Sequence, residues 1–259
     1  MKASARITLF QLFFLSFAYV FSGLFLIRET SFLSLLIPLA PMAVYSALGH
    51  CFLQAAPVCA ENAGWLSFLS CGKPHFFGRI FAELLAFLAA AELVLGWLAF
   101  ASSVQRFSGF LPFSLASALI LILAVFFGAH GVTALGRFAE LSVFLIAPLL
   151  FWLVFWDFAP LDLRAVSENL YAWLTVLPSP VLYLFSATVL KSTAVPKPSR
   201  KIAVPLVAFG GALAAVLCAF LFLLYGAGED HIFYLLFGWM TAVTRLGLLV
   251  CVCAARSPL

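Results

Sequence analysis

Apolar stretches close to 20 residues long recur along the whole chain, for example LSVFLIAPLLFWLVFW at residues 141–156. A helix of about 20 apolar residues has the length needed to cross the hydrocarbon core of a bilayer. Of the 259 residues, 65% are hydrophobic and 9% are charged, and the mean hydropathy is +1.17. Strands of a membrane barrel would show alternating rather than continuous hydrophobicity. The sequence therefore predicts an all-α, polytopic membrane protein.

The apolar stretches predict eight transmembrane helices that form a single integral membrane domain over residues 1–259. The first stretch lacks a small-residue cleavage site after its apolar segment, so we expect a retained helix rather than a signal peptide. The predicted spans are 7–27, 31–49, 79–102, 110–128, 138–156, 172–190, 202–225 and 233–254.

Lysine and arginine residues indicate the orientation, because cytoplasmic loops carry an excess of them. With the N-terminus in the cytoplasm, ten basic residues lie inside and three lie outside, while Arg245 lies within the last span. The reverse orientation would invert that bias. The net charge of +4 thus reflects topology, and it gives no reason to expect a nucleic-acid partner.

The sequence GVTALGRFAEL at residues 131–141 stands at the predicted start of the fifth span. Arg137 and Glu140 are three residues apart, so on a helix they share a face and can form a local ion pair. A solvated pair at the membrane interface would account for both charges. It would not account for the glycines at positions 131 and 136.

This string resembles the start of the fifth helix in the spore germination permease family, the membrane-spanning B subunits of nutrient germinant receptors. The family belongs to the amino acid/polyamine/organocation transporter superfamily. Further similar stretches cover about residues 6–190 in the family's order. They are QLFFLSFAYVFSG (11–23), GRIFAELLAFLAAAELVLGWLAFASSVQRF (78–107) and DLRAVSENL (162–170).

The resemblance implies a fold of two inverted five-helix repeats, with the first at about 7–156 and an incomplete second at about 172–254. Members of the family usually have ten helices, so this chain is similar to a shortened member. The family often carries an acidic residue after the break in its sixth helix, whereas LYLFSATVL at 182–190 has none. This departure puts ion coupling through that position in doubt.

The resemblance also implies a function, a location and partners. We expect a subunit in the inner membrane of a bacterial spore that recognises a small, amino acid-like nutrient and triggers germination. A subunit with soluble domains and a lipoprotein would be its partners. The alternatives are a secondary amino acid transporter, coupled to protons through Glu92, and a shortened assembly subunit that binds no ligand.

Transporters built on inverted repeats hold substrate near the bilayer midplane at paired, interrupted helices. Glycine or proline residues interrupt the outer halves of the first and sixth predicted spans. Prolines break or kink a helix because they lack the N–H donor, although a packing kink without a ligand is the alternative. The expected ligand-binding residues are Ser22, Gly23, Pro178, Ser179, Pro180 and, one turn further, Tyr183.

Two charged residues lie deep in predicted spans, Glu92 in the third and Arg245 in the eighth. Charges in the membrane interior are costly and are usually paired or functional. We therefore expect Glu92 and Arg245 to face each other, in either a structural or a gating role. Glu83 follows Arg79 by four residues, which favours an ordinary local pair near the interface.

The sequence contains no phosphate-binding glycine loop and no nucleophile elbow, so we expect neither enzyme activity nor a cofactor. Cys51, Cys59 and Cys71 fall in one predicted cytoplasmic loop together with His50 and His75. Their irregular spacing does not match a metal site, and the cytoplasm disfavours disulfides. Free thiols are therefore the expected state, without a bound metal.

Overall fold

A computed structural model of the chain describes residues 7–25, 38–55, 76–109, 112–156, 180–184, 200–225 and 232–254. All regular structure in these ranges is helical, which confirms the predicted all-α class. Besides a short helical segment at 180–184, the helices are α1 (Leu9–Phe25), α3 (Leu39–Ala55), α5 (Phe76–Ser108), α6 (Phe113–Ala129), α7 (Gly131–Trp156), α10 (Arg200–Tyr225) and α11 (Ile232–Ala254).

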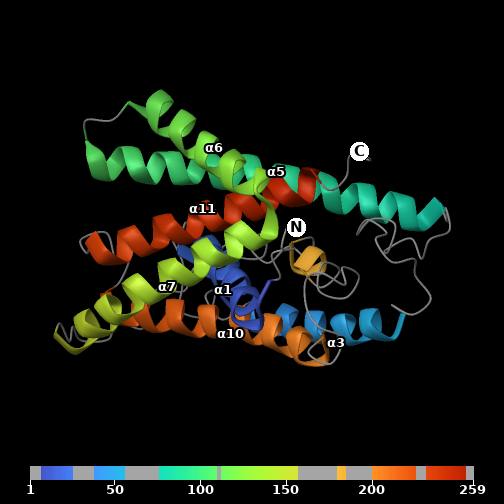
Figure 1. Cartoon of the computed structure of the whole chain (residues 1–259). Coiled ribbons are helices and arrows are strands. Elements are labelled where there is room, and N and C mark those ends of the chain that lie inside the picture. The colour runs from blue at the N-terminus through green and yellow to red at the C-terminus, as the bar shows by residue number, and fades with distance from the viewer. Residues whose placement is uncertain are drawn as a thin grey trace, which may run out of the picture.

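Helix α1 lies at the centre of the bundle and contacts α7, α10 and α11 (Figure 1). Its central position explains why it is buried on nearly all sides from Leu15 to Leu24. Helix α11 packs against α5, α6 and α7, whereas α3 packs against α10. The main hydrophobic core is thus built around α1, with contributions from α10 and α11.

Three helices in the described ranges are long and apolar enough to cross a membrane, at Ile80–Arg106, Lys201–Leu221 and Leu236–Ala254. The bent pair α6 and α7 makes a fourth if it is counted as one span. Helix α1 is apolar but only 17 residues long. These helices support a multi-pass membrane protein, while the count of eight spans remains a prediction.

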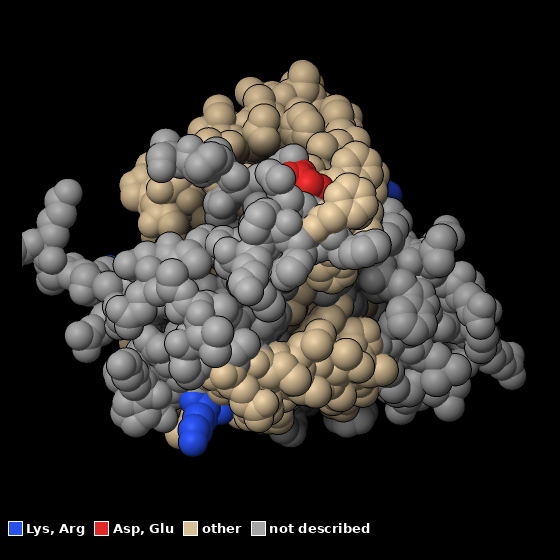
Figure 2. Space-filling view, turned by 90° about the vertical axis from the view of Figure 1, so that its right-hand side faces the viewer, with Lys and Arg blue, Asp and Glu red and all other residues tan. Residues whose placement is uncertain are grey.

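Apolar side chains are exposed along α5 and α6, as expected for surfaces that face lipid; they include Phe81, Phe87, Ile122 and Phe126. Charged groups are sparse on the described surface. In the view of Figure 2, one basic patch lies at the lower edge, a further basic group lies at the right margin and an acidic patch lies near the top, while most of the described surface is uncharged. This distribution fits a chain of which only 9% is charged.

The observed α3 begins and ends later than the predicted span at 31–49. Its two prolines explain the start, because the first turn of a helix tolerates proline where the N–H would have no partner. Pro38 precedes the helix and its oxygen accepts the bond from the Met42 N–H (3.0 Å), while Pro41 lies in the first turn. Both prolines therefore stand at the start of α3.

Helix α1 begins with a reciprocal pair of hydrogen bonds between Thr8 and Gln11. The Thr8 hydroxyl accepts the Gln11 N–H (3.2 Å), and the Gln11 side-chain oxygen accepts the Thr8 N–H (3.0 Å). This capping box satisfies two backbone donors at the helix start that would otherwise lack partners. It fixes the first turn of α1 and the position of the Gln11 side chain.

Helices α6 and α7 meet at a bend of 118°. His130 ends α6, and Gly131 begins α7 with a φ of +81°. Few residues other than glycine adopt this left-handed conformation without strain. Helix α7 therefore starts earlier than the predicted span at 138–156, because the turn at Gly131 already redirects the chain.

Two adjacent glycines bring α10 close to its neighbours. A Cβ on Gly210 would lie 2.5 Å from the backbone oxygen of Phe13 in α1, and one on Gly211 would lie 2.6 Å from the sulfur of Met42 in α3. Glycine is needed at position 210, because a side chain there would meet the backbone of α1 and separate the two helices. At position 211 the nearest atom belongs to the flexible end of the Met42 side chain, which would have to move.

Candidate functional site

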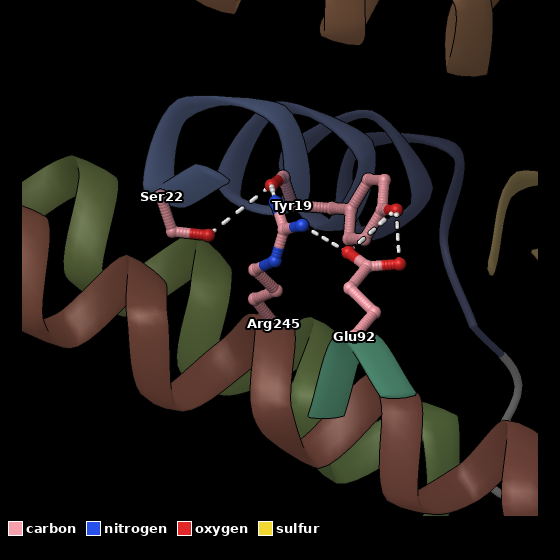
Figure 3. Close-up of polar contacts among 4 residues, drawn as sticks. All are labelled: Tyr19, Ser22, Glu92 and Arg245. Atoms are coloured by element: carbon pink, nitrogen blue, oxygen red, sulfur yellow. Dashed lines mark hydrogen bonds and ion pairs between the residues drawn. The ribbon is translucent and has the colours of Figure 1, made fainter. Parts of the chain in front are cut away.

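Glu92 of α5 and Arg245 of α11 form an ion pair in the interior of the bundle (Figure 3). Their side chains are only 6% and 3% exposed. A charge in this environment is costly unless an opposite charge and hydrogen bonds compensate it. The structure thus brings together the two intramembrane charges that the sequence singles out.

Tyr19 of α1 holds this pair against the central helix. Its hydroxyl donates to the two carboxylate oxygens of Glu92, at 3.0 and 3.2 Å. Arg245 donates from Nη1 to the backbone oxygen of Tyr19 (2.8 Å), and its guanidinium carbon lies 4.5 Å from the centre of the Tyr19 ring. One residue of α1 therefore contacts both charges, through its hydroxyl, its ring and its backbone.

Ser22 completes the set of polar contacts drawn in Figure 3. Its hydroxyl donates to the backbone oxygen of Tyr19 (3.1 Å), the same oxygen that accepts from Arg245. A carbonyl oxygen has two lone pairs and can accept more than one bond. We call Tyr19, Ser22, Glu92 and Arg245 the charge cluster; it joins α1, α5 and α11 and its formal charges cancel.

The sequence suggests an interrupted helix at Ser22 and Gly23, but α1 continues through both residues to Phe25. Glycine weakens a helix without necessarily breaking it, and here tertiary packing buries both positions. The predicted interruption of α1 at Ser22 and Gly23 is therefore absent from the described helix. The role of these residues in ligand binding stays a prediction.

The predicted residues of the sixth span are only partly described. Pro180 and Tyr183 lie in the helical segment 180–184, where Pro180 is buried and Tyr183 is partly buried against the main core. Pro178 and Ser179 lie outside the described residues.

Tyr19 is the member of the charge cluster that the sequence reasoning missed. It lies three residues before Ser22, and residues three apart on a helix are neighbours. A tyrosine inside an apolar span needs a partner for its hydroxyl when it is buried, and Tyr19 is 0% exposed. This requirement is the signal that could have identified Tyr19 as a partner of Glu92.

The string GVTALGRFAEL has a structural explanation at the contact between α7 and α1. Gly136 packs against Gln11, and a Cβ there would lie 3.0 Å from the Gln11 Cβ. Glu140 accepts a hydrogen bond from the Gln11 amide (3.1 Å). In the described part of the chain no ion pair joins Glu140 to Arg137, whose side chain is exposed.

The charge cluster is a buried ion pair together with its hydrogen-bond partners. It offers one carboxylate, one guanidinium and two hydroxyls, and within the described ranges no group of three or more His, Cys, Asp or Glu residues could hold a metal ion. No protein-family model, no curated protein and no solved structure matches the chain.

Proposed function

We propose that this protein is the membrane-embedded subunit of a spore germinant receptor, which recognises a small, amino acid-like nutrient and triggers germination. The observation that carries the proposal is the buried pair of Glu92 and Arg245, held by Tyr19 of the central helix. Intramembrane charges of this kind mark ligand or ion sites by default. The resemblance of residues 6–190 to germination permeases supplies the biological role.

The proposal includes the finer architecture and the partners that the resemblance implies. Eight spans in one complete and one incomplete inverted repeat would lie in the inner membrane of a bacterial spore. A subunit with soluble domains and a lipoprotein would receive the signal. Helices α1, α5 and α11 would then be the elements that pass ligand binding to these partners, because the charge cluster joins them.

Thermal unfolding of the purified, detergent-solubilised chain with amino acids, sugars and nucleosides tests the proposal. A ligand at about 100 times its dissociation constant stabilises the folded state by about 2.7 kcal/mol. Gly23→Trp places a large side chain one residue from Ser22 and is expected to abolish the effect. Leu119→Trp, on the exposed side of α6, is the matched control that keeps it.

The proposal is supported if one class of nutrient stabilises both the native protein and the Leu119→Trp variant but does not stabilise the Gly23→Trp variant. It is overturned if no compound stabilises a well-folded sample, which would favour an assembly subunit that binds no ligand. Equal stabilisation of both tryptophan variants would place binding away from α1 and would also contradict the proposal.

A secondary amino acid transporter is the second candidate, and the carboxylate of Glu92 favours it. A buried carboxylate is the type of group that carries protons through membrane transporters. Uptake of a labelled amino acid into proteoliposomes under an imposed proton gradient separates the two functions. Accumulation that Glu92→Gln abolishes would identify a transporter, whereas binding without accumulation would identify a receptor.

A further inference from the structure

Helices α6 and α7 form a V that holds the carboxyl-terminal half of α11. Figure 1 shows the two helices diverging from the bend at His130 and Gly131, with α11 between them. Helix α11 packs against both arms of the V. The rings of Phe127 and Phe138 close the V near its apex, with their centroids 4.5 Å apart. We call α6 and α7, as they enclose α11, the clamp.

Glycines allow α11 to lie deep in the clamp. A Cβ on Gly128 of α6 would lie 2.6 Å from Cγ1 and 2.8 Å from Cβ of Val250, and 3.1 Å from the backbone oxygen of Gly247. A Cβ on Gly247 would lie 2.6 Å from a methyl carbon of Leu135 in α7. Small residues let membrane helices approach each other this closely. A side chain at position 128 would therefore push α11 away from α6.

A hydrogen bond also fastens α11 to α6. The thiol of Cys251, which is buried, donates to the backbone oxygen of Gly128 (3.2 Å). Gly128 lies in the last turn of α6, where the carbonyl groups have no N–H four residues further along the same helix to bond with. The clamp thus holds α11 by its shape and by a directed bond.

The clamp contacts α11 next to the ion pair. Gly247 follows Arg245 by two residues, which is about 3 Å along the helix axis. Arg245 bonds to Glu92 and to the backbone oxygen of Tyr19, and a hydrogen bond is lost when its atoms separate by about 1 Å. The depth of α11 in the clamp therefore decides whether Arg245 reaches its partners.

We infer that the clamp is a conformational control of the charge cluster. With α11 held between α6 and α7, Arg245 stays paired with Glu92; when the clamp spreads, α11 shifts and the pair separates. The bend provides the hinge, because Gly131 has a φ of +81° and no heavy atom within 4 Å of a Cβ position. Hinges are a few residues at the ends of elements that take up changes in φ and ψ. The inference goes beyond the proposed function and needs no bound ligand.

Mutant cycles in two backgrounds test the inference. The coupling between Glu92 and Arg245 is obtained from the unfolding of the single and double glutamine variants in lipid bicelles. The same cycle is then repeated in Gly128→Ala. The coupling is expected to fall to less than roughly half, because α11 moves away from α6 and carries Arg245 with it. A clamp that only packs the helices would lower the stability of every variant equally and leave the coupling unchanged.

Gly96→Ala is the matched control. Gly96 lies one turn after Glu92 on α5, and its Cβ would lie 3.4 Å from a methyl carbon of Leu246 in α11, in ordinary contact. The substitution adds the same methyl group against the same helix, closer to the ion pair and without a clash. The coupling is therefore expected to stay at its native value.

Cys251 provides a milder change that does not overpack the helices. Cys251→Ala removes the hydrogen bond to Gly128, whereas Cys251→Ser keeps a donor at this position. The alanine variant is expected to lower the coupling more than the serine variant does. The infrared carboxylate band of Glu92, assigned by its loss in Glu92→Gln, is expected to shift in each variant in which the coupling falls.

The outcomes decide between a control and a simple packing contact. Loss of coupling in Gly128→Ala and in Cys251→Ala, with none in Gly96→Ala, supports the inference. Full native coupling in Gly128→Ala overturns it, and if that variant does not fold, full coupling in Cys251→Ala does so. An equal loss in Gly96→Ala also overturns it, because the pair would then respond to any nearby substitution. Nutrient binding is measured separately, so the proposed function can fail while the clamp stands.

Discussion

Arg245 of α11 donates a hydrogen bond to the backbone oxygen of Tyr19 in α1, across 226 residues of sequence, and lies over the ring of the same residue. A substitution of Tyr19 changes its side chain and leaves its backbone oxygen in place. The attachment of α11 to α1 therefore does not depend wholly on the Tyr19 side chain, whereas the hydrogen bonds from α1 to Glu92 depend on the Tyr19 hydroxyl.

Glu92→Gln is expected to destabilise the protein by about 3–5 kcal/mol, because it leaves the Arg245 charge buried without its partner. Arg245→Gln is expected to cost less, since a carboxylate can take up a proton whereas a guanidinium cannot lose one. Unfolding free energies in lipid bicelles would measure both. Glu83→Gln, an exposed position on the same helix, is expected to have little effect, and an equal loss in this control would contradict the prediction.

The double variant Glu92→Gln/Arg245→Gln is expected to be more stable than Glu92→Gln alone. Removal of both charges leaves no unpaired charge in the interior, and the two amides can bond to each other. A double-mutant cycle on unfolding free energies gives the coupling between the two residues. Strictly additive losses would mean that the pair contributes no interaction energy.

Tyr19→Phe is expected to destabilise the protein by about 1.5–3 kcal/mol, the range for a hydrogen bond to a charged group. The variant loses the bonds to Glu92 and keeps the ring beneath Arg245 and the backbone oxygen. Tyr19→Leu also loses the ring and is expected to cost more. Equal stability of the phenylalanine variant and the native chain in the same unfolding assay would rule out this role of the hydroxyl.

Gly210→Ala is expected to destabilise the protein by about 1–3 kcal/mol, a cost typical of an overpacked core. The new methyl group would meet the backbone of α1, which cannot rotate away. Gly96→Ala is the matched control, because its Cβ would lie 3.4 Å from a Leu246 methyl group, in ordinary contact. Thermal unfolding midpoints should fall for Gly210→Ala and stay level or rise for Gly96→Ala.

Gly131→Ala is expected to cost about 1–2 kcal/mol, because the φ of +81° is unfavourable for a side chain. No heavy atom lies within 4 Å of the position that a Cβ would take, so the cost comes from the backbone alone. Gly131→Asn should cost less and Gly131→Val more, since asparagine tolerates this conformation and β-branched residues do not. Unfolding midpoints in any other order would contradict this explanation of the bend between α6 and α7.

The pairing of Glu92 with Arg245 illustrates what can be predicted without coordinates. Both residues stand alone in long apolar stretches, and the high cost of an isolated charge in a membrane limits the choice of partner. The hydrogen bond of Gln11 to Glu140 could not be predicted in this way. Glu140 has Arg137 three residues away as an obvious local partner, and only the packing of α7 on α1 at Gly136 brings Gln11 closer.

The helical class, the apolar segments and the two intramembrane charges can be predicted from the order of residues, because each depends on local composition and on the cost of transfer into lipid. Three features required the packed structure: α1 stays helical through Gly23, Tyr19 links both charges, and Ser16 is buried without a hydrogen-bond partner. These features depend on which helices meet and at what depth. Contacts between residues far apart in the chain set that geometry, and the pattern of residues along one helix does not contain it.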